Sequence, residues 1–274
     1  MTSLFIFFQK LIPKHLISRI AGKLADSKSP IIRMILIRIF QKIYSVSLKD
    51  ALVKNSDDYD SFNAFFTRAL SPTARPICAE ENTIVCPADG TISETGTIYE
   101  GALLQAKGQK YSLASLLGED SPQFEGGSFL TIYLAPNNYH RVHAPLACTL
   151  TRTTAIPGQL FSVNARTESA IPSIFSRNER LICHFDTDHG RMTLIMVGAL
   201  LVGRIESVWS TPGSPFQKVQ REYHNESFEK GAELGRFLLG STVILCHQAQ
   251  RISLDLDLRA GTSVQVGKKI GLGS

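Results

Sequence analysis

Three separate stretches of the sequence carry residues that can perform acid–base or nucleophilic chemistry. Asp89 lies in CPADGTISE, and Ser241 follows Gly240 in GRFLLGSTVIL. Between them, His140 and His143 lie three residues apart in YLAPNNYHRVHAP. Aspartate, histidine and serine are the side chains that form a nucleophile, its base and an orienting carboxylate in many enzymes. The sequence therefore predicts that these stretches meet in one site.

Each stretch also has an ordinary structural interpretation. An Asp-Gly pair such as Asp89–Gly90 is common in hairpin turns for its backbone geometry alone. Histidines at the spacing of His140 and His143 can bind a metal from one helical face, but no carboxylate lies nearby in the sequence and Pro145 favours a loop. We therefore expect no metal site here. A loop at the end of a strand is a common position for an acid–base histidine.

Ser241 interrupts an apolar run, residues 235–245, that otherwise has the composition of a buried strand. No G-x-S-x-G motif surrounds it, so the sequence gives little support to an ordinary serine hydrolase. A hydrolase with an Asp/His/Ser triad and a non-catalytic peripheral membrane module remain alternatives on the residues alone. A hydrolase would keep its chain intact, and the activity of a membrane module would not depend on Ser241.

Several longer motifs identify a family resemblance. LLGST, YHRVHAP and PADG, together with FSVNARTESAIPSIFSRNER, MVGALLVGRIESVW and FNAFFTRAL, closely resemble the phosphatidylserine decarboxylase proenzymes of the prokaryotic type. The resemblance covers nearly the whole chain from the early helices onward. It implies a pyruvoyl-dependent decarboxylase that converts phosphatidylserine to phosphatidylethanolamine and CO2. A pyruvoyl decarboxylase acting on a free amino acid is a further alternative, which the apolar N-terminus disfavours.

The resemblance also implies that the enzyme makes its own cofactor. The Ser241 hydroxyl attacks the Gly240 carbonyl, and the chain is cut into a large chain, 1–240, and a small chain, 241–274, which stay associated. Ser241 becomes a covalent pyruvoyl group, to which the substrate amine binds as a Schiff base, and no metal is required. A glycine before the serine leaves the attacked carbonyl unshielded and tolerates a distorted backbone.

Roles for the remaining site residues follow from the same resemblance. Asp89 and His143 match the positions that activate Ser241, with His143 as the base and Asp89 orienting its ring. His140 matches the neighbouring histidine, for which we expect a part in protonating the substrate during decarboxylation; a structural histidine is the alternative. Tyr133, at the end of the preceding predicted strand, is expected to face the substrate pocket, although a core aromatic needs no special explanation.

The N-terminal segment differs sharply in charge from the rest of the chain. Residues 1–49 hold nine Lys or Arg and one acid, a net charge of +8, which leaves 20 bases and 23 acids, or −3, for residues 50–274. Basic residues interrupt every apolar run before it reaches the length of a membrane-spanning helix. We expect the segment to lie on an anionic membrane, with large apolar side chains entering the acyl boundary: Phe5, Phe7, Phe8, Leu11, Ile35 and Phe40. A helical subdomain that packs its apolar side on the rest of the protein is the alternative.

These features predict the protein's surroundings. The substrate is a membrane lipid, so we expect a peripheral protein on the cytoplasmic face of the cell membrane. Five cysteines without a C-x-x-C motif fit a reducing compartment. A nucleic-acid-binding arm is usually less apolar, so no nucleic-acid partner is expected. A homo-oligomer is compatible with the sequence.

The elements that must position the site fall into two classes. Pro13 and the Ser29–Pro30 pair divide residues 1–49 into short helices, and residues 45–70 also have a helical pattern. Beyond Cys86, short apolar runs alternate with Gly and Pro, as in antiparallel hairpins. The predicted fold is α+β, with an N-terminal helical membrane-association segment, 1–49, attached to a β-rich, sandwich- or barrel-like catalytic domain, 50–274.

Overall fold

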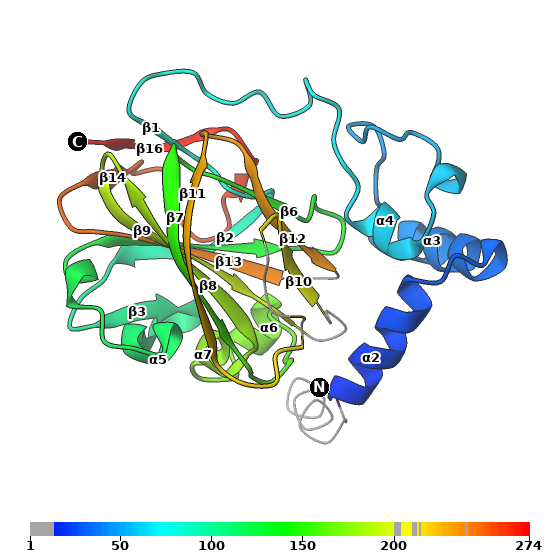
Figure 1. The fold of residues 1–274 in the computed structure, drawn as a ribbon, viewed down its shortest axis with the longest axis horizontal. Coiled ribbons are helices and arrows are strands. Elements are labelled where there is room, and N and C mark those ends of the chain that lie inside the picture. Colours follow the sequence, from blue (N-terminus) through cyan, green and yellow to red (C-terminus); the bar gives the residue numbers. More distant parts are fainter. Residues whose placement is uncertain (1–13, 200–203, 210–212, 214, 239–240) are drawn as a thin grey trace.

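The computed structural model describes residues 14–199, 204–209, 213, 215–238 and 241–274. Helices occupy the N-terminal part, and a β-rich body follows in which all the strand ladders of the described residues are antiparallel (Figure 1). The α+β class predicted from the sequence is confirmed. The segment containing Phe5, Phe7, Phe8 and Leu11 lies outside the described residues.

Two longer helices and one short helix form the N-terminal part: α2 (Lys14–Ala25), α3 (Pro30–Tyr44) and α4 (Phe62–Phe66). Pro30 occupies the first turn of α3, where its missing N–H costs no hydrogen bond. None of the helices within the described ranges has the length and apolar content needed to cross a bilayer.

The helical pattern predicted over residues 45–70 is mostly wrong. This stretch forms a 3-10 turn (Ser56–Asp58) and α4, separated by irregular chain. Asn55 and Ser61 cap these elements by accepting hydrogen bonds from the backbone N–H groups of Asp57 and Ala64. Such polar side chains compete with helix continuation and favour short elements.

Aromatic packing joins α3 to α4. The ring of Phe40 lies 5.1 Å from that of Phe62, 6.4 Å from that of Phe65 and 5.7 Å from that of Phe66, measured between centroids. Phe40 is half-buried and packs against the helical cluster, so this contact gives no support to its expected entry into a membrane. The same cluster contains Tyr59, so it continues through the predicted boundary between residues 49 and 50.

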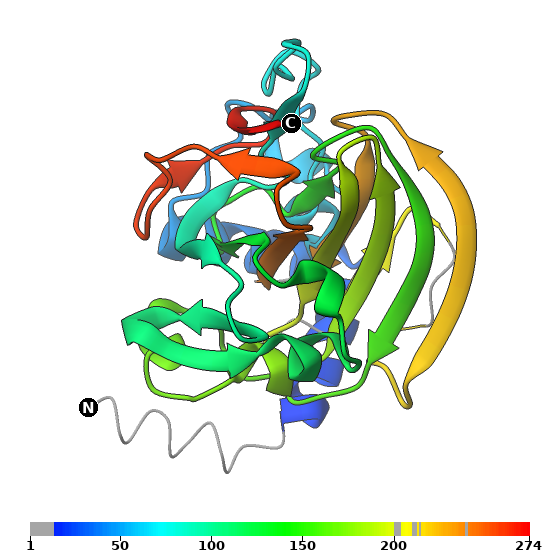
Figure 2. The same cartoon turned by 90° about the vertical axis from the view of Figure 1, so that its left-hand side faces the viewer.

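The main sheet has eight strands in the order β11-β7-β8-β9-β13-β5-β2-β15. Its strands are β2 (Gly90–Thr97), β5 (Ser128–Leu134), β7 (Cys148–Ile156), β8 (Arg180–Thr187), β9 (Gly190–Val197), β11 (Gln220–Phe228), β13 (Ser241–His247) and β15 (Ser263–Val264). β13 is buried along its whole length between β5 and β9. The sheet is strongly twisted, as a side view shows (Figure 2).

Smaller elements surround this sheet. The other strands are β1 (Thr83–Val85), β3 (Ala102–Gln105), β4 (Gln109–Ser112), β6 (Arg141–His143), β10 (Arg204–Ser207), β12 (Glu233–Leu238), β14 (Ile252–Leu254) and β16 (Lys269–Gly273). They form the sheets β1-β16-β14, β10-β12-β6 and β3-β4. The remaining helices are α5 (Leu113–Leu117), α6 (Ala165–Glu168) and α7 (Ile174–Arg177), with 3-10 turns at Ala106–Gly108 and Pro122–Phe124.

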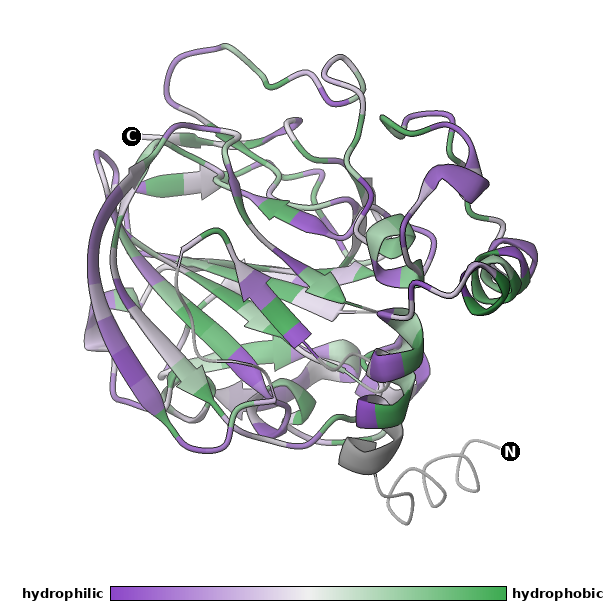
Figure 3. Ribbon diagram, turned by 45° about the vertical axis from the view of Figure 1, so that its right-hand side comes forward, coloured by the Kyte–Doolittle hydropathy of each residue, from purple (hydrophilic) through white to green (hydrophobic). Residues whose placement is uncertain are grey.

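Both faces of the main sheet are covered by apolar side chains. Along β13, Val243 and Leu245 belong to one core, and Ile244 and Cys246 belong to another on the opposite face. Hydrophobic residues accordingly run through the strands, and they also lie on α2 and α3 outside the β-rich body (Figure 3). Because successive side chains in a strand alternate between faces, each core is specified by every second residue.

Candidate active site

Ser241 is the first residue of β13 and lies in the interior of the protein. Its backbone pairs with Leu134, the last residue of β5, and the next residue, Thr242, pairs with Val197, the last of β9. The Ser241 side chain is fully buried, and its Oγ has no hydrogen-bond partner among the described residues. A buried hydroxyl without a partner is unusual and calls for an explanation. Gly240, the other half of the predicted cleavage site, lies outside the described residues.

Alternation along β13 determines which way the serine faces. Val243, two residues on, packs in the core shared with Leu134 and with Val142 of β6. Ser241 therefore shares the face of the sheet on which β6, β10 and β12 lie. The end of β12 and the start of β13 lie at the same end of the molecule as the loop between β5 and β6, because β12 pairs with β6 and β13 pairs with β5 in an antiparallel sense.

His140 lies in this loop and is completely buried. Its backbone carbonyl accepts a hydrogen bond of 3.0 Å from the N–H of Phe237, three residues before Gly240. Its ring stacks on Phe66 of α4, with the centroids 4.0 Å apart. Burial, together with the positive charge of Arg68, lowers the pKa of His140 to about 3. The imidazole is therefore neutral at physiological pH.

His143 ends β6, and both of its ring nitrogens have partners. Nδ1 lies 2.8 Å from the Gly231 carbonyl oxygen, and Nε2 lies 2.9 Å from the hydroxyl of Tyr139. A carbonyl can only accept, so Nδ1 carries the proton and Nε2 accepts from Tyr139. Burial lowers the pKa of His143, although the bond to Gly231 opposes that shift. The neutral imidazole thus presents Nε2 as its basic atom.

Asp89 immediately precedes β2 at the same end of the main sheet. The glycine beside it permits a close approach of β5, because a Cβ on Gly90 would lie 2.4 Å from the carbonyl oxygen of Tyr133. The Asp-Gly pair therefore allows tight strand packing, which the hairpin-turn interpretation did not include. Thr91 pairs with Tyr133, which in turn pairs with Thr242 of β13, so Asp89 belongs to the same end of the sheet as Ser241.

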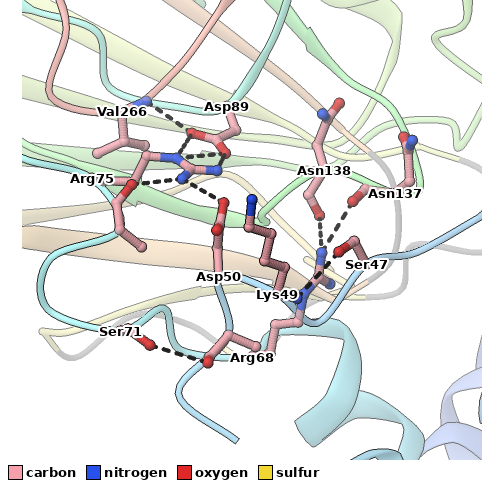
Figure 4. A network of polar contacts seen from close by, with 12 residues as sticks. Ser47, Lys49, Asp50, Arg68, Ser71, Arg75, Asp89, Asn137, Asn138 and Val266 are labelled. Carbon is pink, nitrogen blue, oxygen red and sulfur yellow. Dashed lines mark hydrogen bonds and ion pairs between the residues drawn. The ribbon is translucent and has the colours of Figure 1, made fainter. Parts of the chain in front are cut away.

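The Asp89 carboxylate is held mainly by Arg75. Arg75 Nε donates to both carboxylate oxygens at 3.0 and 3.1 Å, and its Nη2 donates to Oδ2 at 2.6 Å (Figure 4). The N–H of Val266 donates to Oδ1 at 2.9 Å, and Asp50 accepts from Arg75 Nη1 at 3.0 Å. Asp89 raises the pKa of His143 through its charge, but the Nδ1 of that histidine is bonded to Gly231.

Tyr133 lies beside the site but on the other face of the sheet. It pairs with Thr242, one residue beyond Ser241, and packs against the core that contains Ile244 and Cys246. Burial raises the pKa of its hydroxyl, and Tyr44 at the end of α3 contributes to the same direction. Its expected contact with substrate stays a prediction.

Two cavities lie near different ends of β13. One of about 210 Å³ is lined by Asp89, Tyr139 and residues of the helical part, at the Ser241 end. Another of about 400 Å³ is lined by Met192, which pairs with His247 at the opposite end of the strand. The first therefore lies beside Asp89, whereas Ser241, His140 and His143 do not line it. Across the described ranges, no three His, Cys, Asp or Glu side chains gather as they would around a metal ion.

The structure brings forward residues that motif analysis overlooked: Phe66, Arg68, Arg75, Tyr139 and Gly231. Three of these residues lie inside motifs already identified in the sequence: Phe66 and Arg68 in FNAFFTRAL, and Tyr139 in YHRVHAP. An arginine two residues after a pair of phenylalanines is a usable signal, since a charge next to buried rings needs a partner. Nothing in the local sequence points to the Gly231 carbonyl, which reaches His143 from 88 residues away.

Comparisons with known proteins identify the family of the chain. A family model described as phosphatidylserine decarboxylase matches residues 62–272, and a second, described as PSD, matches residues 4–45. The chain is 44% identical over 279 residues to the phosphatidylserine decarboxylase proenzyme of Pseudomonas aeruginosa (strain LESB58), covering 98% of this chain and 96% of that protein. It is 45% identical to the proenzymes of Alcanivorax borkumensis (277 residues; 98% and 95%) and Bordetella pertussis (280 residues; 98% and 94%).

Proposed function

This chain belongs to the phosphatidylserine decarboxylase family, and we propose that it cuts itself between Gly240 and Ser241 and then uses a pyruvoyl group made from Ser241 to release CO2 from phosphatidylserine. The observation that carries the proposal is the Ser241 hydroxyl, which is buried and unpartnered among the described residues. Where water is excluded, it cannot attack the neighbouring carbonyl in place of the Ser241 hydroxyl.

Self-cleavage requires no external reactant except water. Ser241 Oγ attacks the Gly240 carbonyl carbon and displaces the amide nitrogen, so that an ester replaces the peptide bond. Loss of the Ser241 Cα proton then expels the Gly240 carboxylate and leaves dehydroalanine. Addition of water and loss of ammonia convert this residue to the pyruvoyl group. The products are chains 1–240 and 241–274.

The two histidines and Asp89 take the proton-transfer roles in this proposal. His143 accepts the Ser241 proton, and Asp89 stabilises the resulting imidazolium by its charge. Two features support this: His143 is neutral with its Nε2 basic, and Asp89 already raises its pKa. His140, neutral and beside the β12 end, supplies or positions the proton that replaces CO2 on the substrate.

The residues around Ser241 suit a buried pyruvoyl group. The small side chain stands at the start of a fully buried strand, so the group would be held by β5 and β9 on either side. A pyruvoyl group supplies an electron-accepting carbonyl for decarboxylation. The same strand pairs with β5 and β9 of the large chain, which supports continued association of the two chains after cleavage.

An exposed apolar stripe on the helical part of the protein supports a lipid substrate. Along α3, four isoleucines at four-residue spacing are exposed, namely Ile31, Ile35, Ile39 and Ile43, and Ile20 and Leu24 are exposed on α2. Basic residues lie between them. We propose that this stripe enters the acyl boundary of an anionic membrane while the bases contact head groups, which makes the protein peripheral. Ile35, expected at the membrane from the sequence, is part of the stripe.

Intact mass spectrometry and a decarboxylation assay test the proposal. The wild type should yield a 34-residue fragment (274 − 241 + 1), about 4 kDa as a share of 30.2 kDa, with a blocked N-terminus. Ser241→Ala should abolish cleavage. Thr242→Val is the matched control, since Thr242 Oγ1 is the neighbouring buried hydroxyl and is equally unpartnered in the described structure. An uncut, active wild type would exclude the pyruvoyl mechanism.

Variants of the other site residues separate making the cofactor from using it. Asp89→Asn and His143→Ala should leave the chain largely uncut. His140→Ala should permit substantial cleavage but release less CO2 per cleaved molecule. Normal CO2 release per cleaved His140→Ala molecule would remove His140 from the decarboxylation step, and full cleavage of folded His143→Ala would remove His143 from self-processing.

A further inference from the structure

Arg68 is a buried cation without a counter-ion in the described structure. Arg68 comes two residues after the end of α4, and it is 4% exposed. Nη2 donates to the carbonyls of Asn137 and Asn138 at 3.0 and 3.1 Å (Figure 4). Nη1 donates to the Phe66 carbonyl at 3.5 Å. Nε is buried and has no partner among the described residues. A buried charge with an unused donor is costly unless an anion completes its coordination.

Other buried or half-buried arginines show what a completed environment looks like. Arg75 pairs with Asp89 and Asp50, and Arg141 pairs with Glu233 at 2.8 Å. Arg180 has only carbonyl partners, but all three of its guanidinium nitrogens donate to them. Arg68 differs from Arg180 in two respects: one donor is left over, and the side chain lines a cavity.

That cavity has the size and lining for a small anionic group. Its volume is about 210 Å³, several times the share of one water molecule in the liquid, about 30 Å³. Besides Arg68 it is lined by the hydroxyl-bearing Ser45 and Ser47 and by Asn137 and Asn138. Hydroxyl and amide groups can donate further hydrogen bonds to a phosphate or carboxylate. Arg75, Asp50 and Asp89 also line it, but the two carboxylates already pair with Arg75, which leaves Arg68 as the lining charge without a counter-ion among the described residues.

The cavity lies between the proposed membrane surface and the proposed chemistry. Ser45 directly follows α3, which carries the isoleucine stripe. On the other side, Tyr139 lines the cavity beside His140, and Phe66, two residues before Arg68, stacks on the His140 ring. The cavity therefore has the end of α3 on one side and the chain segment that leads to the histidines on the other.

We propose that Arg68 binds the phosphodiester of the lipid head group, an inference that rests on the proposed decarboxylation of phosphatidylserine. The substrate carboxylate is the less suitable partner, because a cation that holds it stabilises the charge that must be lost when neutral CO2 leaves. The phosphodiester keeps its charge throughout the reaction, so a bond to it anchors substrate and product alike. Arg68 is thus a residue for substrate binding and specificity.

The proposal is tested by kinetics of cleaved enzyme with lipid in detergent micelles. Arg68→Gln should raise KM by about tenfold to a hundredfold, the value of one charge-assisted hydrogen bond, with a smaller change in kcat per cleaved molecule. Arg68→Lys, which keeps the charge, should recover part of the loss. The matched control is Arg141→Gln, which also removes an arginine contact to the α4 segment, at the carbonyl of Thr67, but from a charge paired with Glu233.

Soluble competitors identify which part of the head group is bound. Glycerophosphoethanolamine should inhibit the wild type competitively and lose that inhibition in Arg68→Gln, whereas L-serine, which has the carboxylate but no phosphate, should inhibit both equally. An unchanged KM in Arg68→Gln, an equal rise in Arg141→Gln, or loss of serine inhibition alone would each overturn the proposal. An uncut or inactive wild type would instead count against the proposed function itself.

Discussion

Replacing Tyr139 by phenylalanine should accelerate self-cleavage. In the structure, Nδ1 of His143 is bonded to Gly231, so Nε2 is the atom that can accept a proton, and the Tyr139 hydroxyl occupies it at 2.9 Å. For His143 to act on Ser241, this hydrogen bond must be given up first. The tyrosine ring also stacks on the imidazole, with centroids 5.6 Å apart, and phenylalanine retains that contact.

The size of the effect follows from the hydrogen bond that is removed. A neutral hydrogen bond contributes about 0.5–1.5 kcal/mol net, because breaking it is partly compensated by new partners. If that amount is taken from the barrier, the cleavage rate rises by about twofold to tenfold at 25 °C. Tyr139→Phe should therefore shorten the half-life of the precursor without changing the products.

A pulse-chase experiment in cell-free translation measures this rate. All four methionines lie within residues 1–240, so radioactive methionine labels both the precursor and the large chain, which a denaturing gel separates. Tyr59→Phe is the matched control. Both tyrosines are 6% exposed, and Tyr59 also uses its hydroxyl in one hydrogen bond, 2.7 Å to the Val53 carbonyl, away from the histidines. Its cleavage rate should equal that of the wild type.

A slower or unchanged rate in Tyr139→Phe would refute the reasoning. In that case Nε2 of His143 is not the atom that receives the Ser241 proton. The base would then be sought at His140, whose ring nitrogens have no hydrogen bond of good geometry within the described residues.

Three further outcomes are expected, the first two measured in the uncut Ser241→Ala background. Arg75→Ala should lower the free energy of unfolding by about 3 kcal/mol in urea titrations, because it leaves the buried Asp89 carboxylate without its cation. Asp50→Asn, at a side chain that is 46% exposed, should lower it by less than about 1 kcal/mol, and equal losses would contradict the prediction. Burial lowers the pKa of His247 from 6.5 to about 3, so below about pH 6.5 the unfolded chain binds a proton that the folded chain does not, and stability falls as the pH falls. His247→Gln should reduce that slope by up to about 1.4 kcal/mol per pH unit between about pH 5.5 and 4.5, and an unchanged slope would show that His247 is not held neutral. The double change of Ile35 and Ile39 to Gln should weaken binding to anionic vesicles by about tenfold in sedimentation assays. Adding salt to the variant should weaken its remaining binding by a smaller factor. Undiminished binding of the variant would show that the α3 stripe does not contact the membrane.

Much of the candidate site could be predicted because its chemistry lies in short motifs. PADG, YHRVHAP and LLGST each keep their reactive residue next to neighbours fixed by the covalent chain, so Asp89, His140, His143 and Ser241 were identifiable without coordinates. The α+β class was predictable for a similar reason, since hydrophobic periodicity and Gly/Pro punctuation are local properties. The concentration of basic charge before residue 50 needs only a count.

Partnerships between distant residues could not be predicted in the same way. The sequence suggested that Asp89 orients His143, yet in the structure Asp89 binds Arg75 and Nδ1 of His143 binds Gly231. A guanidinium group or an imidazole can bind the Asp89 carboxylate, and a carboxylate or a carbonyl can bind His143. Which partner lies within reach depends on strand register and loop path rather than on residue type.

The membrane-facing residues show the same division. Apolar residues in a basic segment predicted a membrane surface. Two adjacent residues of that segment nevertheless differ in environment, since Phe40 packs on Phe62 and Phe66 whereas Ile39 is 53% exposed. A helix turns by about 100° per residue, so neighbours face different directions, and only the docking of α4 decides which face is covered. The sequence alone determined the candidate reactive residues, the class of fold and the charge asymmetry; tertiary packing decided which buried groups meet, because those contacts join segments that are far apart in the chain.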